Sequence, residues 1–174
     1  NRDGDTLAQR LAKEAIALDP NYAAAYSLLS RTQWRSVAFR TAENPKEMMQ
    51  NSLNSALKAV ELDKSADTLS NLGWVYTRMG QHDKGVAIAE NALNFNPNSS
   101  RTYSNLGLTF LMGGRCEDAV PMFENAMRLS PIPSANILFH ACTAYQDCGR
   151  YSKCITAGKR AVELAPDSLF AHLY

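Results

Sequence analysis

The seven residues SNLGWVY, which begin at residue 70, return as SNLGLTF at residue 104, 34 residues later. Three consecutive segments (66–99, 100–134 and 135–168) align on shared small residues, with Gly73, Gly107 and Cys142 in corresponding positions. A second small residue follows 19 positions later in every segment, and each segment closes on a proline. A period of this length marks one supersecondary unit that stacks on copies of itself, so it constrains the fold more than any other feature.

Each segment has the pattern of two helices. Leu69, Leu72 and Tyr76 fall on one face of a helix that Gly80 ends. The following helix carries apolar residues on two faces, so it needs cover on both sides, which stacked neighbouring pairs provide. The pattern therefore predicts an all-α chain.

The middle segment resembles the tetratricopeptide repeat family through Tyr103, Leu106, Gly107, Phe110, Ala119, Phe123, Ala126 and Pro131. The segments on either side replace some of these residues but keep small side chains where two helices cross. The resemblance implies a right-handed α-solenoid of stacked antiparallel helix pairs, the tetratricopeptide superhelix.

We expect a single array over residues 1–174. Its parts are the second helix of a truncated repeat (1–22), a repeat with an extended hairpin (23–65), three regular repeats (66–99, 100–134 and 135–168) and the start of a truncated repeat (169–174). A chain that begins and ends inside repeats indicates a piece of a longer protein, or an array whose open end is covered by a partner.

The repeat at 23–65 is ten residues longer than the others between its two small positions, Ser30 and Ala59. Divided equally, this excess lengthens each helix by about five residues, or roughly 7 Å. Asn44, Pro45 and Glu47 have the pattern of a helix start. The extension is either a length difference without function or a contact element for a partner or second subunit.

Composition excludes several classes. The formal net charge of +1 lacks the excess of cations expected of a nucleic-acid binder, and no apolar run is long enough to span a membrane. No signal peptide is visible, which favours the cytoplasm.

The four cysteines have no CxxC spacing, so we expect no metal site and reduced, packed thiols. Cys142 and Cys154 meet at a predicted helix crossing, where a disulfide requires a Cα separation below about 7 Å.

No pattern indicates catalysis or a cofactor, so we expect a binding protein and not an enzyme. The resemblance implies a concave groove lined by the first helix of each repeat. Aligned to the family, the partner-binding residues are Arg31, Trp34, Asn71, Trp74, Arg78, Arg101, Asn105 and His140. An Asn can hydrogen-bond a peptide backbone, and an Arg can pair with carboxylates. The alternative to a binding role is that the two Asn residues contact no ligand and that Trp74 packs against the next repeat.

Three functions compete. The first is a protein–protein interaction scaffold that binds a peptide or protein segment in the concave groove. The second is self-assembly into a homo-oligomer through the array ends or the 34–49 hairpin. The third is the regulatory arm of a larger bacterial signalling enzyme, since AMRLSPIPS and KRAVELAPDS are weakly similar to repeat regions of nucleotidyl cyclase-type proteins.

Overall fold

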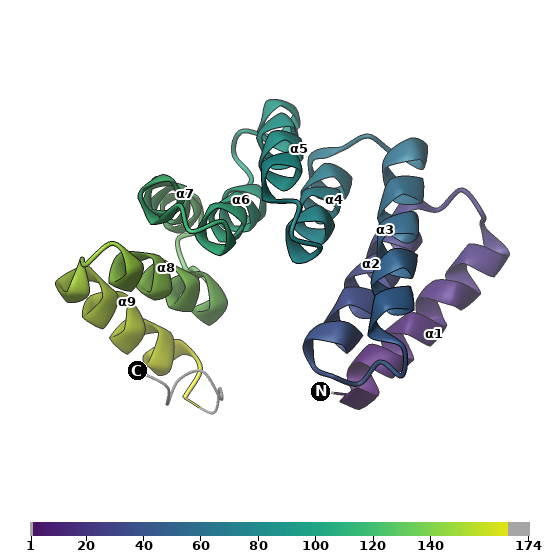
Figure 1. Cartoon of the computed structure of the whole chain (residues 1–174), viewed down its shortest axis with the longest axis horizontal. Coiled ribbons are helices and arrows are strands. Elements are labelled where there is room, and N and C mark those ends of the chain that lie inside the picture. Colours follow the sequence, from purple (N-terminus) through teal and green to yellow (C-terminus); the bar gives the residue numbers. More distant parts are fainter. Residues whose placement is uncertain (1, 167–174) are drawn as a thin grey trace. The chain divides into compact units, whose positions relative to one another are not determined.

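The chain folds into helices joined by short connections (Figure 1). The computed structural model describes residues 2–166. Within that stretch there are nine helices and no strand: α1 (Arg2–Leu18), α2 (Ala23–Ala38), α3 (Pro45–Leu62), α4 (Ala66–Arg78), α5 (His82–Phe95), α6 (Ser100–Met112), α7 (Cys116–Leu129), α8 (Ala135–Asp147) and α9 (Tyr151–Leu164). None of these helices has the length and apolarity needed to cross a membrane. The predicted all-α class is confirmed.

Local signals fix where the helices begin and end. The Asn44 side chain accepts a hydrogen bond from the Glu47 backbone N–H at 3.3 Å, and Pro45 is the first residue of α3, as predicted. Serine side chains cap α4, α6 and α8 in the same way. Gly80 has a φ of +78° in the turn after α4, a conformation that costs glycine little.

The two helices of the extended hairpin, α2 and α3, are shorter than the sequence predicts. α2 has 16 residues and α3 has 18, whereas α4 and α5 have 13 and 14. The other extra residues form the connection 39–44, in which Arg40 has a positive φ of 55°. The prediction of about five extra residues in each helix was wrong. The left-handed Arg40 keeps α2 from continuing, and the extended Asn44 cap delays the start of α3.

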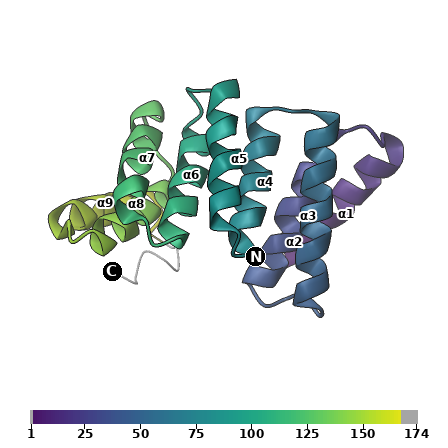
Figure 2. The ribbon, with the colours of Figure 1, turned by 45° about the horizontal axis from the view of Figure 1, so that its top comes forward.

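The described residues form two compact units, one containing α1–α5 and the other α6–α9. In the first unit α2 packs on α3 and α4 packs on α5, while α2 and α3 both contact α4 (Figure 2). Its core contains Leu53 and Ala56 of α3 and Leu72, Val75 and Tyr76 of α4.

The α4–α5 crossing is close because both helices present glycine. A Cβ added at Gly73 would lie 2.9 Å from the Gly85 carbonyl oxygen, and one added at Gly85 would lie 2.4 Å from the Thr77 hydroxyl oxygen. Either contact is too short for a side chain. The small residues that set the repeat therefore set the distance between the paired helices.

In the second unit a large side chain takes the corresponding space. Phe123 of α7 is fully buried, and its ring atoms lie 3.0–3.1 Å from the position of a Cβ at Gly107 of α6. In α8 and α9 the same layer contains Cys142 and Gly158. Glu124 of α7 accepts hydrogen bonds from Tyr145 and Lys153, which ties three helices of this unit together.

The prediction of reduced cysteines was wrong. The structure contains two disulfides, Cys116–Cys148 and Cys142–Cys154, and no free cysteine. Their Cα separations are 5.7 Å and 4.0 Å, both below the limit stated above. The low number of cysteines suggested free thiols, but pairing depends on where the cysteines lie. The repeat brings the start of α7 close to the end of α8, and it brings the middle of α8 close to α9.

We predict that Gly73→Ala lowers the free energy of unfolding by about 1–3 kcal/mol, because the new methyl group must push α5 away from α4. Chemical denaturation followed by circular dichroism measures this effect. Gly4→Ala in α1 is the matched control, since nothing lies within 4 Å of its added Cβ and alanine favours a helix. Equal losses in the two variants would contradict the close crossing.

We predict that the intact mass rises by about 4 Da on reduction, because each disulfide gains two hydrogen atoms. Reduction should also lower the thermal midpoint, since a crosslink that closes 32 residues stabilises by roughly 3–4 kcal/mol in the chain-entropy description. Mass spectrometry and a melting curve with and without reductant test both statements. An unchanged mass would show that the thiols are free.

Candidate functional site

The first unit brings together five of the eight residues predicted to bind a partner. Arg31 and Trp34 lie on one face of α2 together with Ser27, because positions 27, 31 and 34 are spaced by one helical turn each. Asn71, Trp74 and Arg78 share a face of α4 for the same reason. We call these six residues of the two neighbouring helices the aromatic face.

Two tryptophans and one arginine make contact on the aromatic face. The rings of Trp34 and Trp74 meet edge to face, with centroids 5.7 Å apart and planes inclined by 76°. The Arg78 guanidinium carbon lies 5.8 Å from each ring centroid. Arg78 forms no ion pair with a carboxylate among the described residues, so two indole rings position an unneutralised cation.

Three buried polar atoms of the aromatic face have no hydrogen-bond partner within the described part of the chain: Ser27 Oγ, Trp34 Nε1 and Asn71 Nδ2. Asn71 is only 6% exposed. The indole and amide nitrogens are pure donors, and the serine hydroxyl can also donate. A buried donor without an acceptor costs about 1–3 kcal/mol, so these atoms favour a ligand that supplies acceptors.

The remaining predicted residues lie in the second unit. Arg101 is exposed and Asn105 half-buried on α6, one turn apart. The His140 ring of α8 stacks on Phe123 with centroids 6.4 Å apart, and burial lowers the pKa of His140. His140 is therefore neutral at pH 7 and belongs to the packing around Phe123. Five of the eight predicted residues thus belong to the first unit and three to the second.

A pocket of about 580 Å³ opens on α8 and α9. Its lining is mainly apolar and includes Phe139, Tyr151, Ile155 and Val162, with the Cys142–Cys154 disulfide among them. No predicted binding residue lines this pocket. It has none of the unpartnered donors that distinguish the aromatic face.

The sequence predicted which residues lie on the aromatic face, but it did not predict that some of their polar atoms lack hydrogen-bond partners. The repeat register alone located Trp34, Trp74 and Arg78 on first helices. It gave no sign that Ser27 and Trp34 would be left without partners. That outcome depends on which side chains of α4 fill the space beside α2.

The tetratricopeptide repeat family matches residues 65–131. This match covers the two predicted repeats at 66–99 and 100–134 apart from the last residues of the second, and it spans less than half of the chain. No curated protein sequence matches the chain.

Solved structures extend the fold comparison to most of the chain. A tetratricopeptide repeat protein of Thermus thermophilus, TTC0263, matches with a TM-score of 0.77 and 18% identity over 92% of this chain and 83% of that one. YrrB, described as a tetratricopeptide repeat protein with an unusual peptide-binding site, matches with a TM-score of 0.61 and 20% identity over 97% and 82%.

A third structure is much longer than this chain. The APC/C hetero-tetramer Cut9–Hcn1 matches with a TM-score of 0.78 and 15% identity over 98% of this chain but 32% of that one. At these identities the structures show a shared tetratricopeptide fold. The weak similarity to nucleotidyl cyclase-type proteins stays a prediction.

Proposed function

We propose that the tetratricopeptide repeats form a protein–protein interaction scaffold and that the aromatic face binds a peptide or protein segment. The observation that carries the proposal is the pair of buried, unpartnered donors Trp34 Nε1 and Asn71 Nδ2. Peptide carbonyl oxygens are acceptors of the right kind for both. The description of YrrB as a peptide-binding protein of this fold supports the same class of ligand.

The length of the aromatic face suits a short extended segment. Ser27 and Trp34 are seven residues apart on α2, as are Asn71 and Arg78 on α4, which is about 10.5 Å along each helix. Three residues of extended chain cover the same distance, at roughly 3.3–3.6 Å per residue. Such a segment presents alternate carbonyls toward the donors while its side chains contact the indole rings.

Arg78 adds a preference for a carboxylate. The two indole rings hold its guanidinium in place, so little side-chain entropy is lost when an acidic group binds. A carboxylate pairs bidentately with a guanidinium and neutralises it. The expected ligand is therefore an extended segment with an acidic side chain or terminus beside Arg78.

We predict that Trp34→Phe weakens peptide binding about tenfold, because it keeps an aromatic ring but removes the donor that the peptide satisfies. Peptides are first selected from a random library on the wild-type protein. Their affinities are then measured by fluorescence, since both tryptophans of the chain lie on the aromatic face.

Two further variants make this test specific. Asn71→Ala should reduce affinity by a similar factor without lowering the thermal midpoint, because its amide nitrogen has no partner to lose. Asn94→Ala on the exposed surface of α5 is the matched control, since Asn94 lies outside the aromatic face, and it should leave the affinity of these peptides unchanged. Selected peptides that bind Trp34→Phe and Asn71→Ala as tightly as the wild type would refute the assignment.

Self-assembly through the array ends or the 34–49 hairpin stays a prediction, and static light scattering over a concentration series tests it. A cytoplasmic location also stays a prediction. The two disulfides argue against it, because disulfides persist mainly in oxidising compartments.

A further inference from the structure

The two disulfides of the second unit lie in different surroundings. Cys142–Cys154 joins α8 to α9 inside one pair, and both cysteines are buried. Cys116–Cys148 joins successive pairs, because Cys116 is the first residue of α7 and Cys148 directly follows α8. Both residues of this second crosslink are half-buried and therefore more accessible to a reductant or a solute than the buried Cys142 and Cys154.

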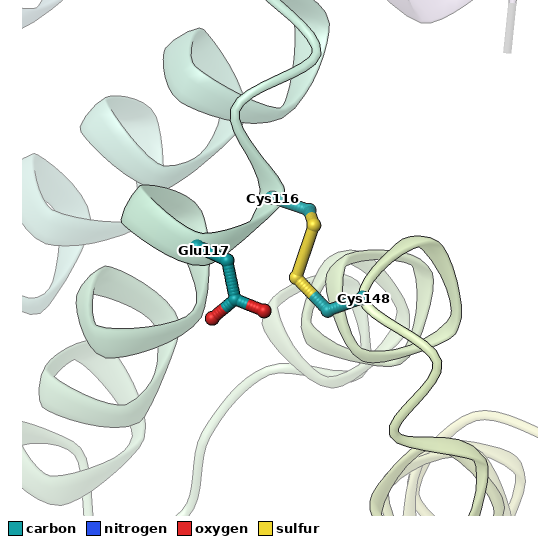
Figure 3. Close-up of side chains that lie close together, drawn as sticks. All are labelled: Cys116, Glu117 and Cys148. Atoms are coloured by element: carbon teal, nitrogen blue, oxygen red, sulfur yellow. A yellow bond between two sulfur atoms is a disulfide. The ribbon is translucent and has the colours of Figure 1, made fainter.

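A carboxylate lies beside the Cys116–Cys148 crosslink. The Sγ atoms of Cys116 and Cys148 and a carboxylate oxygen of Glu117 all lie within 4.8 Å of one another (Figure 3). Among the residues that the structure describes, this is the one group of three His, Cys, Asp or Glu side chains close enough to share a metal ion. Two sulfurs and one oxygen are a donor set that suits Zn²⁺.

We propose that reduction of the Cys116–Cys148 disulfide creates a Zn²⁺ site with these two thiolates and the Glu117 carboxylate as ligands. A dithiol reductant supplies two electrons and two protons, breaks the S–S bond and becomes a disulfide itself. The two thiols then bind Zn²⁺ and release two protons to the solvent. Water takes the fourth position, and oxidation of the pair abolishes the site.

The backbone is compatible with both states. Tetrahedral zinc with Zn–S bonds of about 2.3 Å places its two sulfurs about 3.8 Å apart. The Cα atoms of Cys116 and Cys148 are 5.7 Å apart, so rotation of the two side chains brings the sulfurs to this distance without moving α7 or α8. Cys116 also lies in the first turn of α7, where the helix dipole favours a thiolate.

The charges around the site are balanced. Arg150 forms an ion pair with Glu117, and Arg115 is paired with Asp118 at 2.7 Å. Two thiolates and one carboxylate carry a charge of −3, which Zn²⁺ and the Arg150 guanidinium together neutralise. The ion pair also holds the Glu117 carboxylate near the sulfurs before the metal arrives, as outer partners of metal ligands do.

The other cysteine pair provides an internal control. Reduced Cys142 and Cys154 are also two neighbouring thiols, but no third His, Cys, Asp or Glu ligand joins them within the described residues. They are also buried, with Cys142 only 1% exposed. The proposal therefore distinguishes two dithiols in one unit by the presence of Glu117.

The test measures Zn²⁺ binding to the protein after anaerobic reduction and removal of the reductant. A chromophoric chelator reports Zn²⁺ affinity, and Cd²⁺ gives an ultraviolet thiolate-to-metal absorption that counts the sulfur ligands. We expect one tight site per reduced chain, none in the oxidised protein, and loss of the site in Cys116→Ser/Cys148→Ser. Cys142→Ser/Cys154→Ser should retain it.

Glu117→Gln tests the third ligand. Glu117 is exposed, so this variant folds normally, and its Zn²⁺ affinity should fall at least about tenfold while the Cd²⁺–thiolate absorption persists. Unchanged affinity in Glu117→Gln would overturn the three-ligand site. Equal binding by oxidised and reduced protein, or a tight site that survives Cys116→Ser/Cys148→Ser, would overturn the proposal as a whole.

Discussion

The close crossing of the two helices in each pair is the contact on which the rest of the structure depends. Ala56, Ala59, Ala92, Ala126 and Ala161 are all fully buried on second helices, where each lets the partner helix approach. Gly73 and Gly85 bring α4 and α5 closer than any side chain permits. Because the two helices of a pair lie close together, the first helices of successive pairs can also touch. In the first unit, α4 contacts α2 in this way. The contact between Trp34 and Trp74 follows from that approach.

The two sides of α2 differ in how their polar atoms are satisfied. On the side that faces α3, the Ser30 and Ser52 hydroxyl groups form a hydrogen bond of 3.2 Å. The Ser55 hydroxyl donates to the Gln33 side-chain oxygen at 3.1 Å. On the aromatic face, Ser27 and Trp34 have no such partners. Buried polar groups are normally hydrogen-bonded, so the unpaired side of α2 is the one to which we assign the peptide in the proposed function.

The sequence predicted the helices better than the details of the site. Repeat spacing and turn residues located the helix pairs, because Gly80 and the Asn44 cap act through local backbone geometry. The lengths of α2 and α3 were overestimated, since nothing in the sequence marks Arg40 as a left-handed residue. The free donors on Trp34 and Asn71 could not be predicted, because they depend on how side chains from two helices pack.

The disulfides show why position matters more than number. Four cysteines are few for 174 residues, yet all four fall between residues 116 and 154, where the repeat brings them together in pairs. The first unit contains both tryptophans and no cysteine. Reduction therefore changes covalent bonds only in the second unit, and the aromatic face keeps its donors in either redox state. The proposed Zn²⁺ site and the proposed peptide site thus use different residues, so each can be altered by mutation without removing a group that the other requires.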